Sequence, residues 1–318
     1  MRCEMKAGFL YVHLDKRYDG WRVEDVLTTA LALPAAFSHK LLAAGHVCAG
    51  KKTLCRTDEL KAGSRLTLKD PTPVSRLFEL ADIGVEGLEI CYEDDHVLIV
   101  NKPAGVIVHS DNPSERTLDG LVAHYYRETG QVLPILHAHR LDKPTTGAVV
   151  YAKHGFVARA LDAELVRHRM ARRYVAVVFG AKLARSQTVD KPIGRDRHRS
   201  SLYRVSSTGK EARTHIVVRA TSPVQGEHLS LLSCALETGR THQIRVHCAS
   251  LDVPIVGDEE YGGQRIRNWP APDAIALHAR EVSFYHPYDE QDVVVKCPLA
   301  SDWTKFLRQE WGIEDDLW

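Results

Sequence analysis

The chain carries one run that constrains the interpretation of the rest, His139-Arg140-Leu141-Asp142-Lys143-Pro144-Thr145-Thr146-Gly147. Cations stand on both sides of Asp142, which favours an ionised carboxylate at neutral pH. Pro144 fixes its own φ and disfavours helix in the residue before it, and Gly147 precedes a strand-like segment, residues 148–151. We therefore expect a carboxylate on a rigid turn that leads into a sheet, where proteins can hold catalytic groups. The alternative is a structural turn in which the aspartate bonds its own backbone and pairs with Arg140.

Two other short runs accompany this one. Asn101-Lys102-Pro103-Ala104-Gly105 follows the buried strand-like residues 97–100, and Arg240-Thr241-His242-Gln243-Ile244-Arg245 comes later in the chain. In this order and spacing the three runs resemble those of the RluA-type pseudouridine synthases, over about residues 85–305. That family isomerises uridine in folded RNA and uses one essential aspartate, which matches Asp142.

The resemblance implies a chemical role for several residues. Asp142 would attack the anomeric carbon as a nucleophile or withdraw the neighbouring sugar proton as a base, and the sequence leaves both open. Arg245 would hold the carboxylate ionised, and Ile244 would form an apolar wall of the base pocket. Tyr174 would stack on the flipped uracil and relay a proton. The structural alternatives are a locally paired surface charge for Arg245 and a packing residue for Tyr174.

Four neighbouring residues are expected to bind the substrate. Arg140 would enter the space of the flipped base or contact its phosphate. His139 would support the loop through a hydrogen bond. Arg172 stands where the family has lysine and keeps the capacity to pair with phosphate. Lys102 would position its own loop or contact RNA.

Residues 9–70 are predicted to form a small unit of their own. Apolar residues spaced three and four apart predict a first helix, which Pro34 ends. Ser38 is predicted to cap a second short helix that Gly45 terminates, and two strands follow.

This helix–helix–strand order resembles the alpha-L RNA-binding module that was first named from a ribosomal small-subunit protein. The resemblance implies that Lys40, Lys51 and Lys52 face RNA. An unrelated helical cap with exposed lysines is the alternative. Two closely spaced prolines then predict an extended linker over residues 71–88.

Residues 89–305 are predicted to form the catalytic domain, and residues 306–318 an acidic C-terminal tail. Helices are expected at 118–126 and 155–170, among short strands such as 174–179. Strands mixed with helices without regular βαβ alternation predict an α+β fold with a mostly antiparallel mixed sheet.

Composition narrows the class of protein. A chain of 318 residues with 44% hydrophobic and 26% charged residues is ordinary globular material. No apolar run approaches the ~20 residues that span a bilayer, and the N-terminus lacks a signal-peptide pattern, so we expect a cytoplasmic protein. The seven scattered cysteines predict reduced thiols and no zinc site.

Net charge gives no general attraction to a polyanion, because it is only +1. RNA binding would therefore rest on local groups of arginine. Two such groups stand in the chain, Arg167, Arg169, Arg172 and Arg173, and Arg195, Arg197, Arg199 and Arg204.

These observations predict an RNA-uridine isomerase that acts on structured RNA. The appended module favours ribosomal RNA over transfer RNA. Isomerisation oxidises nothing and removes no group, so we expect no cofactor and no catalytic metal, and we expect a monomer. The alternatives are a transfer-RNA pseudouridine synthase, a non-catalytic RNA-binding ribosome-assembly protein of the same fold, and a nucleoside hydrolase.

Overall fold

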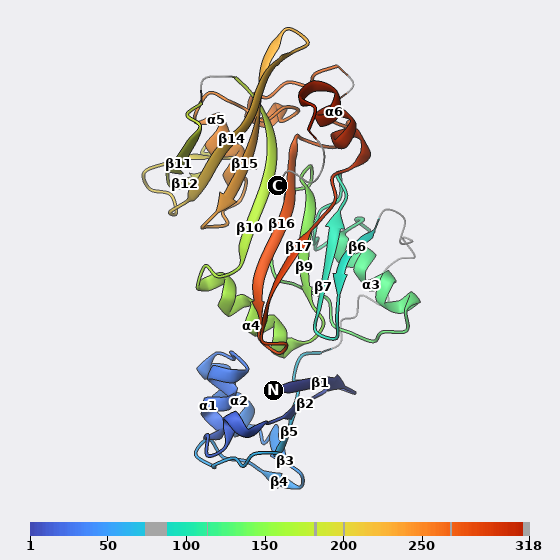
Figure 1. The fold of residues 1–318 in the computed structure, drawn as a ribbon, viewed down its shortest axis with the longest axis vertical. Coiled ribbons are helices and arrows are strands. Elements are labelled where there is room, and N and C mark those ends of the chain that lie inside the picture. The colour runs from blue at the N-terminus through green and yellow to red at the C-terminus, as the bar shows by residue number, and fades with distance from the viewer. Residues whose placement is uncertain (74–87, 113, 181–182, 200, 268, 314–318) are drawn as a thin grey trace.

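The structure is a computed structural model that describes residues 1–73, 88–112, 114–180, 183–199, 201–267 and 269–313. Figure 1 shows a large unit built on long strands and a smaller unit at one end, which holds the N-terminus. Most of the predicted linker, residues 71–88, and the end of the predicted tail lie outside the described residues. Within the described residues, no helix is long and apolar enough to cross a membrane.

The small unit is an antiparallel sheet covered by short helical segments. Its strands, in sheet order, are β1 (Arg2–Lys6), β2 (Phe9–His13), β5 (Arg65–Lys69), β3 (Val47–Ala49) and β4 (Lys52–Thr53). Its helical segments are η1 (Lys16–Tyr18), α1 (Val23–Asp25), the π-helical η2 (Val26–Ala30) and α2 (Ala35–Ala43). Alternate residues of β2 and β5 are fully buried, which is the pattern of a sheet with one face in a core.

The small unit differs from its sequence prediction at two places. Ser38 does not cap a helix, because α2 already begins at Ala35, directly after Pro34. The fixed φ of proline suits a helix start and alanine is a strong helix former, so the helix begins one turn earlier. Ser38 instead lies buried inside the helix and donates from Oγ to the carbonyl of Pro34. At the other end, β1 extends the sheet back to Arg2 rather than to residue 9.

The large unit is built on one extended sheet. Its strands, in sheet order, are β11 (Ser186–Asp190), β14 (Arg213–Val224), β15 (Glu227–Leu236), β10 (Ala171–Phe179), β16 (Leu277–His286), β9 (Thr146–Ala152), β7 (Val97–Lys102) and β6 (Glu89–Glu93). β17 (Gln291–Lys296) pairs with β16, β8 (Leu136–His137) pairs with β9, and β12 (Ile193–Arg195) forms a separate hairpin with β13 (Tyr203–Val205). The β16–β9 pair is parallel and the other ladders are antiparallel, so the predicted α+β class with a mostly antiparallel mixed sheet is confirmed.

Helices flank this sheet, as Figure 1 shows for α3, α4 and α6. They are α3 (Leu118–Glu128), α4 (Gly155–Val166), α5 (Gln243–Ala249), the 3-10 segment η4 (Glu259–Tyr261) and α6 (Ser301–Trp311). The continuous apolar runs of β7 and β9 are buried on both faces, as expected for strands between layers. The helix predicted for 155–170 stops at Val166, and His168 takes a left-handed φ of 56°.

Gly147 fixes how closely two strands approach at the start of β9. Its φ is +110°, and a Cβ there would lie 2.3 Å from the carbonyl oxygen of Ala279 on β16. Only glycine fits both constraints. The turn that carries Asp142 is thereby held against β16.

The predicted boundary at residue 305 falls inside α6. Phe306 and Leu307 are buried, and Phe306 stacks on Trp269 with ring centroids 4.1 Å apart. The segment up to Trp311 is therefore a packed amphipathic helix rather than a solvated tail. Its apolar residues follow helical spacing, a signal that the acidic residues nearby obscured.

The small unit contacts the turn between β16 and β17. Glu290 in this turn accepts hydrogen bonds from the amino terminus of Met1 (3.3 Å), from Arg17 (2.6 Å) and from the hydroxyl of Tyr18 (2.8 Å). Phe37 of α2 also packs edge-on against Phe156 of α4. Polar and apolar contacts together join the two units at this end of the sheet.

Candidate active site

A pocket of about 850 Å³ opens between the Asp142 turn, β10 and the start of α5. Seven of the residues singled out from the sequence line it, namely His139, Arg140, Asp142, Arg172, Tyr174, Ile244 and Arg245. These residues come from segments up to about a hundred positions apart in the chain, so the fold brings two of the three motifs and β10 to one cavity.

The Asp142 turn is braced by the third motif. Thr145 donates its backbone N–H to the carbonyl of Asp142 (3.1 Å), directly before β9 begins. The carbonyl of Lys143 accepts from the backbone N–H of Gly105 (3.0 Å) and from Nζ of Lys102 (3.1 Å). These hydrogen bonds hold the backbone of the turn, and the Asp142 side chain is 22% exposed, so its carboxylate is open to the pocket.

Lys102 lies beneath the pocket rather than on its surface. The side chain is fully buried, and Nζ donates to the carbonyls of Pro103 (2.9 Å), Val106 (2.6 Å) and Lys143. Burial lowers the pKa of Lys102 to about 7, and the negative charge of Asp142 acts in the opposite direction. Of the two roles expected for this residue, its position favours holding the loops together and leaves it no contact with RNA.

Arg245 faces Asp142, but its shortest bonds go elsewhere. Nη1 lies 3.6 Å from Oδ2 of Asp142. Nε and Nη2 donate to the two carboxylate oxygens of Asp258 (2.8 and 2.7 Å), and Nη2 also donates to Glu260 (2.6 Å). Burial disfavours the charged guanidinium, yet the hydrogen bonds and charge of Asp258 raise the pKa of Arg245. The result is a rigid, buried cation with one nitrogen turned toward Asp142.

Tyr174 and Ile244 form apolar walls of the pocket. Both are nearly buried, Tyr174 on β10 and Ile244 on the first turn of α5. Burial raises the pKa of Tyr174, while the charge of Arg172 opposes that shift. The phenol is therefore protonated at neutral pH, and Tyr174 lines the cavity.

His139, Arg172 and Arg140 surround this wall. Nε2 of His139 accepts from the backbone N–H of Val150 (3.4 Å), and burial, helped by the charge of Arg172, lowers the pKa of His139 to about 3. This hydrogen bond agrees with a supporting role for His139, which stays a prediction. Arg172 lies against Gly239, where a Cβ would come within 2.7 Å of Nη1, whereas Arg140 is exposed at the pocket mouth.

The chain matches known proteins over the same motifs. Residues 96–250 match the family described as RNA pseudouridylate synthase. YhcT of Bacillus subtilis (strain 168), described as an uncharacterized RNA pseudouridine synthase, is 35% identical over 95% of this chain and 98% of its own length. This chain belongs to the RluA-type RNA pseudouridine synthases.

Two further proteins are similar to this synthase. Ribosomal large subunit pseudouridine synthase D of Vibrio parahaemolyticus is 34% identical over 81% of this chain and 82% of its own length. The solved structure of human RNA pseudouridylate synthase domain containing 1 superposes with a TM-score of 0.57 at 28% identity, over 69% of this chain and 86% of the human one. The predicted enzyme class is thus confirmed, and the assignment of the small unit to the alpha-L module stays a prediction.

Sequence reasoning assigned no role to four residues in or behind the pocket of the synthase, of which His242 lines the pocket. Nε2 of His242 lies 3.9 Å from Oδ1 of Asp142, and Nδ1 lies 2.8 Å from the hydroxyl of Tyr261. Asp258 and Glu260 hold Arg245. His242 lies inside a recognised motif, whereas the sequence analysis did not consider the run from Asp258 to Tyr261, because no local spacing reveals its contact with another element.

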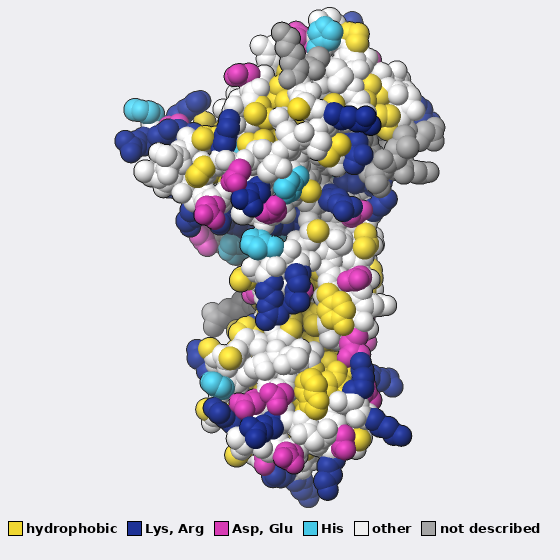
Figure 2. Space-filling view, turned by 60° about the vertical axis from the view of Figure 1, so that its left-hand side comes forward, with side chains coloured by type: hydrophobic (Ala, Val, Ile, Leu, Met, Phe, Trp, Pro, Cys, Tyr) yellow, Lys and Arg dark blue, Asp and Glu magenta, His cyan; other side chains and the backbone are white. Residues whose placement is uncertain are grey.

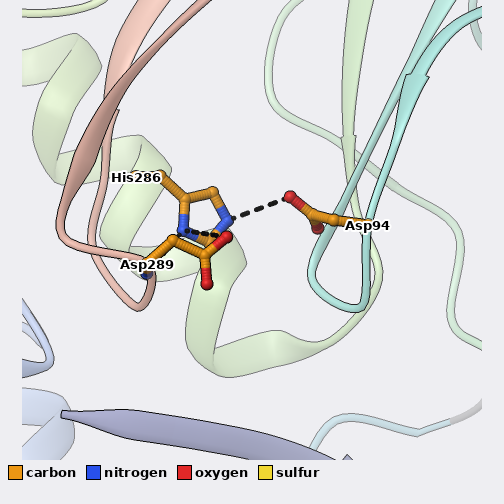
Figure 3. Close-up of side chains that lie close together, drawn as sticks. All are labelled: Asp94, His286 and Asp289. Carbon is orange, nitrogen blue, oxygen red and sulfur yellow. Dashed lines mark hydrogen bonds and ion pairs between the residues drawn. The ribbon is translucent and has the colours of Figure 1, made fainter.

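A second group of carboxylates and imidazole lies at the other end of the sheet. Figure 3 shows Asp94 from the β6–β7 turn facing His286 and Asp289 of the β16–β17 hairpin. Nδ1 of His286 accepts the backbone N–H of Asp289 (3.0 Å), so a neutral ring carries its proton on Nε2, 3.4 Å from Asp94. A neutral imidazole has one lone pair, and here it is already used. This donor set does not suit a metal ion, and the absence of a catalytic metal stays a prediction.

The three lysines expected to face RNA lie outside the pocket. Lys40, Lys51 and Lys52 are exposed on the small unit, and Lys52 pairs with Asp58 (3.2 Å). Figure 2 shows lysine and arginine side chains in separate groups over both units, with acidic side chains between them. The charge is thus distributed locally, as the low net charge predicts.

Proposed function

We propose that this synthase isomerises specific uridines in structured ribosomal RNA, with Asp142 as the essential carboxylate acting on a uridine flipped into the pocket. The observation that carries the proposal is the open carboxylate of Asp142 on the pocket wall, faced by Arg245. Glu237 also lines the pocket, but it is committed to Arg213 (3.0 Å) and His215 (2.6 Å). That leaves Asp142 as the carboxylate available for chemistry.

The chemistry requires few groups. Asp142 attacks the anomeric carbon and displaces uracil, or it removes the adjacent sugar proton as the glycosidic bond breaks. The retained uracil then turns and bonds through carbon 5, which releases Asp142 from the anomeric carbon on the first route and is accompanied by return of the proton to the sugar on the second. Carbon 5 then loses its proton, and the phenol of Tyr174 acts as the relay for it. Because the uracil is retained, no second carboxylate is needed to expel a leaving group, in contrast to a glycosidase.

Two features support a large RNA as the substrate. The arginines of the β12–β13 hairpin, Arg195, Arg197, Arg199 and Arg204, are exposed, and Tyr203 of the same hairpin packs edge-on against His242, so this basic group borders the pocket. The ribosomal name of the Vibrio relative and the small unit favour ribosomal RNA over transfer RNA. We further place the enzyme in the cytoplasm as a monomer.

The direct test maps pseudouridine across total RNA from cells with and without the gene, and from deleted cells that express wild type or Asp142→Asn. We expect one or a few ribosomal positions to lose the modification and only wild type to restore it. Loss confined to transfer RNA would select the transfer-RNA alternative. An unchanged map would select the non-catalytic assembly protein, and release of free uracil by the purified protein would select the hydrolase.

The small unit is tested by its lysines. Replacing Lys40, Lys51 and Lys52 by alanine should weaken RNA binding and flatten its dependence on salt, since each lost phosphate contact lowers the slope of log K against log salt by about 0.9 or less. Lys305→Ala, an exposed lysine on α6, is the matched control. An unchanged slope in the triple variant would show that this face does not touch RNA.

A further inference from the structure

We propose that His242 is a positioning residue that directs an Nε2–H at the carboxylate of Asp142, and that the hydroxyl of Tyr261 fixes this tautomer. The inference rests on the proposed function for the identity of the reacting carboxylate. It assigns a role to a histidine and a tyrosine that the reaction scheme above does not use.

His242 is held in an uncommon backbone conformation. Its φ of 57° and ψ of 23° are left-handed, and it is the residue directly before α5. Non-glycine residues take this conformation rarely, and such outliers concentrate at functional sites. Tyr203 and Tyr261 both pack edge-on against the ring, each with centroids 5.7 Å away. The backbone and both rings thus aim the imidazole at the pocket.

The hydrogen bonds determine which ring nitrogen carries the proton. The backbone N–H of Tyr203 can only donate, and it donates to the hydroxyl of Tyr261 (3.0 Å). Among the described residues, the acceptor left for the hydroxyl proton of Tyr261 is Nδ1 of His242, 2.8 Å away. This pattern favours Nδ1 as the acceptor, with the proton of the neutral ring on Nε2. That nitrogen faces Oδ1 of Asp142 at 3.9 Å.

Burial favours the neutral form of the His242 ring. Burial lowers the pKa of His242, the charge of Asp142 opposes this shift, and Arg245 adds to it. The carboxylates of Asp258 and Glu260 also face the ring, but both are bound to Arg245. A neutral donor orients the Asp142 carboxylate without adding a second cation that would reduce its basicity.

One short segment supports both groups that face Asp142. Asp258 and Glu260 hold Arg245, which faces Oδ2, and Tyr261 holds His242, which faces Oδ1. The guanidinium of Arg245 also lies over the ring of Tyr261, 4.8 Å from its centroid. The two carboxylate oxygens are thus faced from two directions by groups anchored at 258–261. The 3.9 Å gap is typical of a substrate-free site, where catalytic hydrogen bonds are long and shorten in the complex.

The tautomer can be measured without RNA. Long-range ¹H–¹⁵N spectra of the full-length protein, labelled on histidine, distinguish Nε2–H from Nδ1–H and from the charged ring. We expect Nε2–H for His242 at neutral pH, assigned by its loss in His242→Gln, and a mixture of tautomers in Tyr261→Phe. Tyr285→Phe, an exposed tyrosine, is the control. An Nδ1–H or a charged ring in wild type would overturn the proposal, whatever RNA the enzyme modifies.

Single-turnover rates on an unmodified RNA that wild type converts test the positioning role. His242→Leu should lower the rate about 10- to 100-fold with RNA affinity within about two-fold, because misplacement of a reacting group costs that much. His242→Gln, whose amide retains a donor, should recover most of the rate. Equal losses in the two variants would show that a hydrogen bond from residue 242 to Asp142 does not contribute to the rate.

The pH profile of Tyr261→Phe separates positioning from simple support. Without the hydroxyl, Nδ1 is free to take a proton, so the ring charges more readily as pH falls. The variant should lose rate, by about ten-fold, toward pH 6 and approach wild type near pH 8. A loss of the same size at every pH would overturn the role of Tyr261 in keeping the ring of His242 neutral, while its role in fixing the tautomer is tested by the spectra.

Discussion

The synthase has carboxylates beside an imidazole at both ends of its long sheet, and the two sites differ in how well the carboxylate is hydrogen-bonded. Asp94 accepts the backbone N–H groups of His96 (2.7 Å) and Val97 (2.6 Å) and the hydroxyl of Tyr92 (2.5 Å), next to a fully buried His286. Among the described residues, no donor lies within hydrogen-bonding distance of the Asp142 side chain, although a guanidinium and an imidazole face it at 3.6 and 3.9 Å. A satisfied carboxylate is structural, and one left unsatisfied above a cavity can react.

The sharpest way to break this comparison is to neutralise each carboxylate in turn. Asp142→Asn should lower turnover by at least about 10³-fold and leave RNA affinity within a few-fold, because it removes the reacting oxygen but little volume. Asp94→Asn should reduce stability and leave turnover near wild type. Single-turnover assays, binding curves and urea unfolding of both variants measure this. Substantial turnover by Asp142→Asn would refute the assigned chemistry.

The buried cation is expected to matter for both folding and activity. Arg245→Met leaves Asp258, which is 1% exposed, without its partner, and should cost about 3–5 kcal/mol of unfolding free energy. The double variant Arg245→Met/Asp258→Leu should regain much of that stability and still be inactive, since Asp142 remains without its cation. Denaturant unfolding and turnover of both variants provide the measurement. A double variant with normal turnover would remove Arg245 from the site.

A tyrosine at each end of the sheet provides a second comparison between the two sites. Tyr174→Phe should keep fold and RNA affinity and lose about 10²-fold in turnover, since the relay of the carbon 5 proton needs the hydroxyl. The control is Tyr288→Phe, which alters a buried tyrosine stacked on His154 near the Asp94 group and should leave turnover unchanged. Equal activity of the two variants would restrict Tyr174 to packing.

The smallest expected effect concerns acid stability. Burial lowers the pKa of His139 to about 3 and that of His278 to about 4, whereas an unfolded histidine titrates near 6.5. The unfolded chain therefore binds more protons below about pH 6.5, and stability falls as pH drops from about 7 to 5. Each histidine should account for about 1.4 kcal/mol at about pH 5.5.

Unfolding in urea at about pH 7.5 and 5.5 measures this loss. His139→Gln should reduce the difference between the two conditions, whereas His39→Gln on the exposed face of α2 should not. If the difference survives in His139→Gln unchanged, the buried neutral imidazole is not its source.

The sequence predicted the turn that carries Asp142 because its signals are local, whereas the role of Asp142 follows from the family resemblance and stays a prediction. The backbone at this turn is restricted by residues close together in sequence, Asp142, Pro144 and Gly147. Buried strands such as β7 and β9 can be recognised from their continuous apolar runs. The sequence could not predict the roles of residues whose partners lie far away in the chain. The ion pair between Arg245 and Asp258 joins residues 13 positions apart, and the His242 ring packs against two tyrosines from other segments. Neither contact leaves a pattern in the sequence.

The strand β16 sets a length scale for substrate choice. Its first residue, Leu277, lines the pocket, and the turn after its last residue, His286, carries Glu290, which holds Met1 and Arg17 of the small unit. Ten residues of strand span about 33 Å. For an RNA that touches both units, the length of this strand fixes the distance between the small unit and the pocket. We expect such an RNA to present its uridine at about this distance from the part that contacts the small unit.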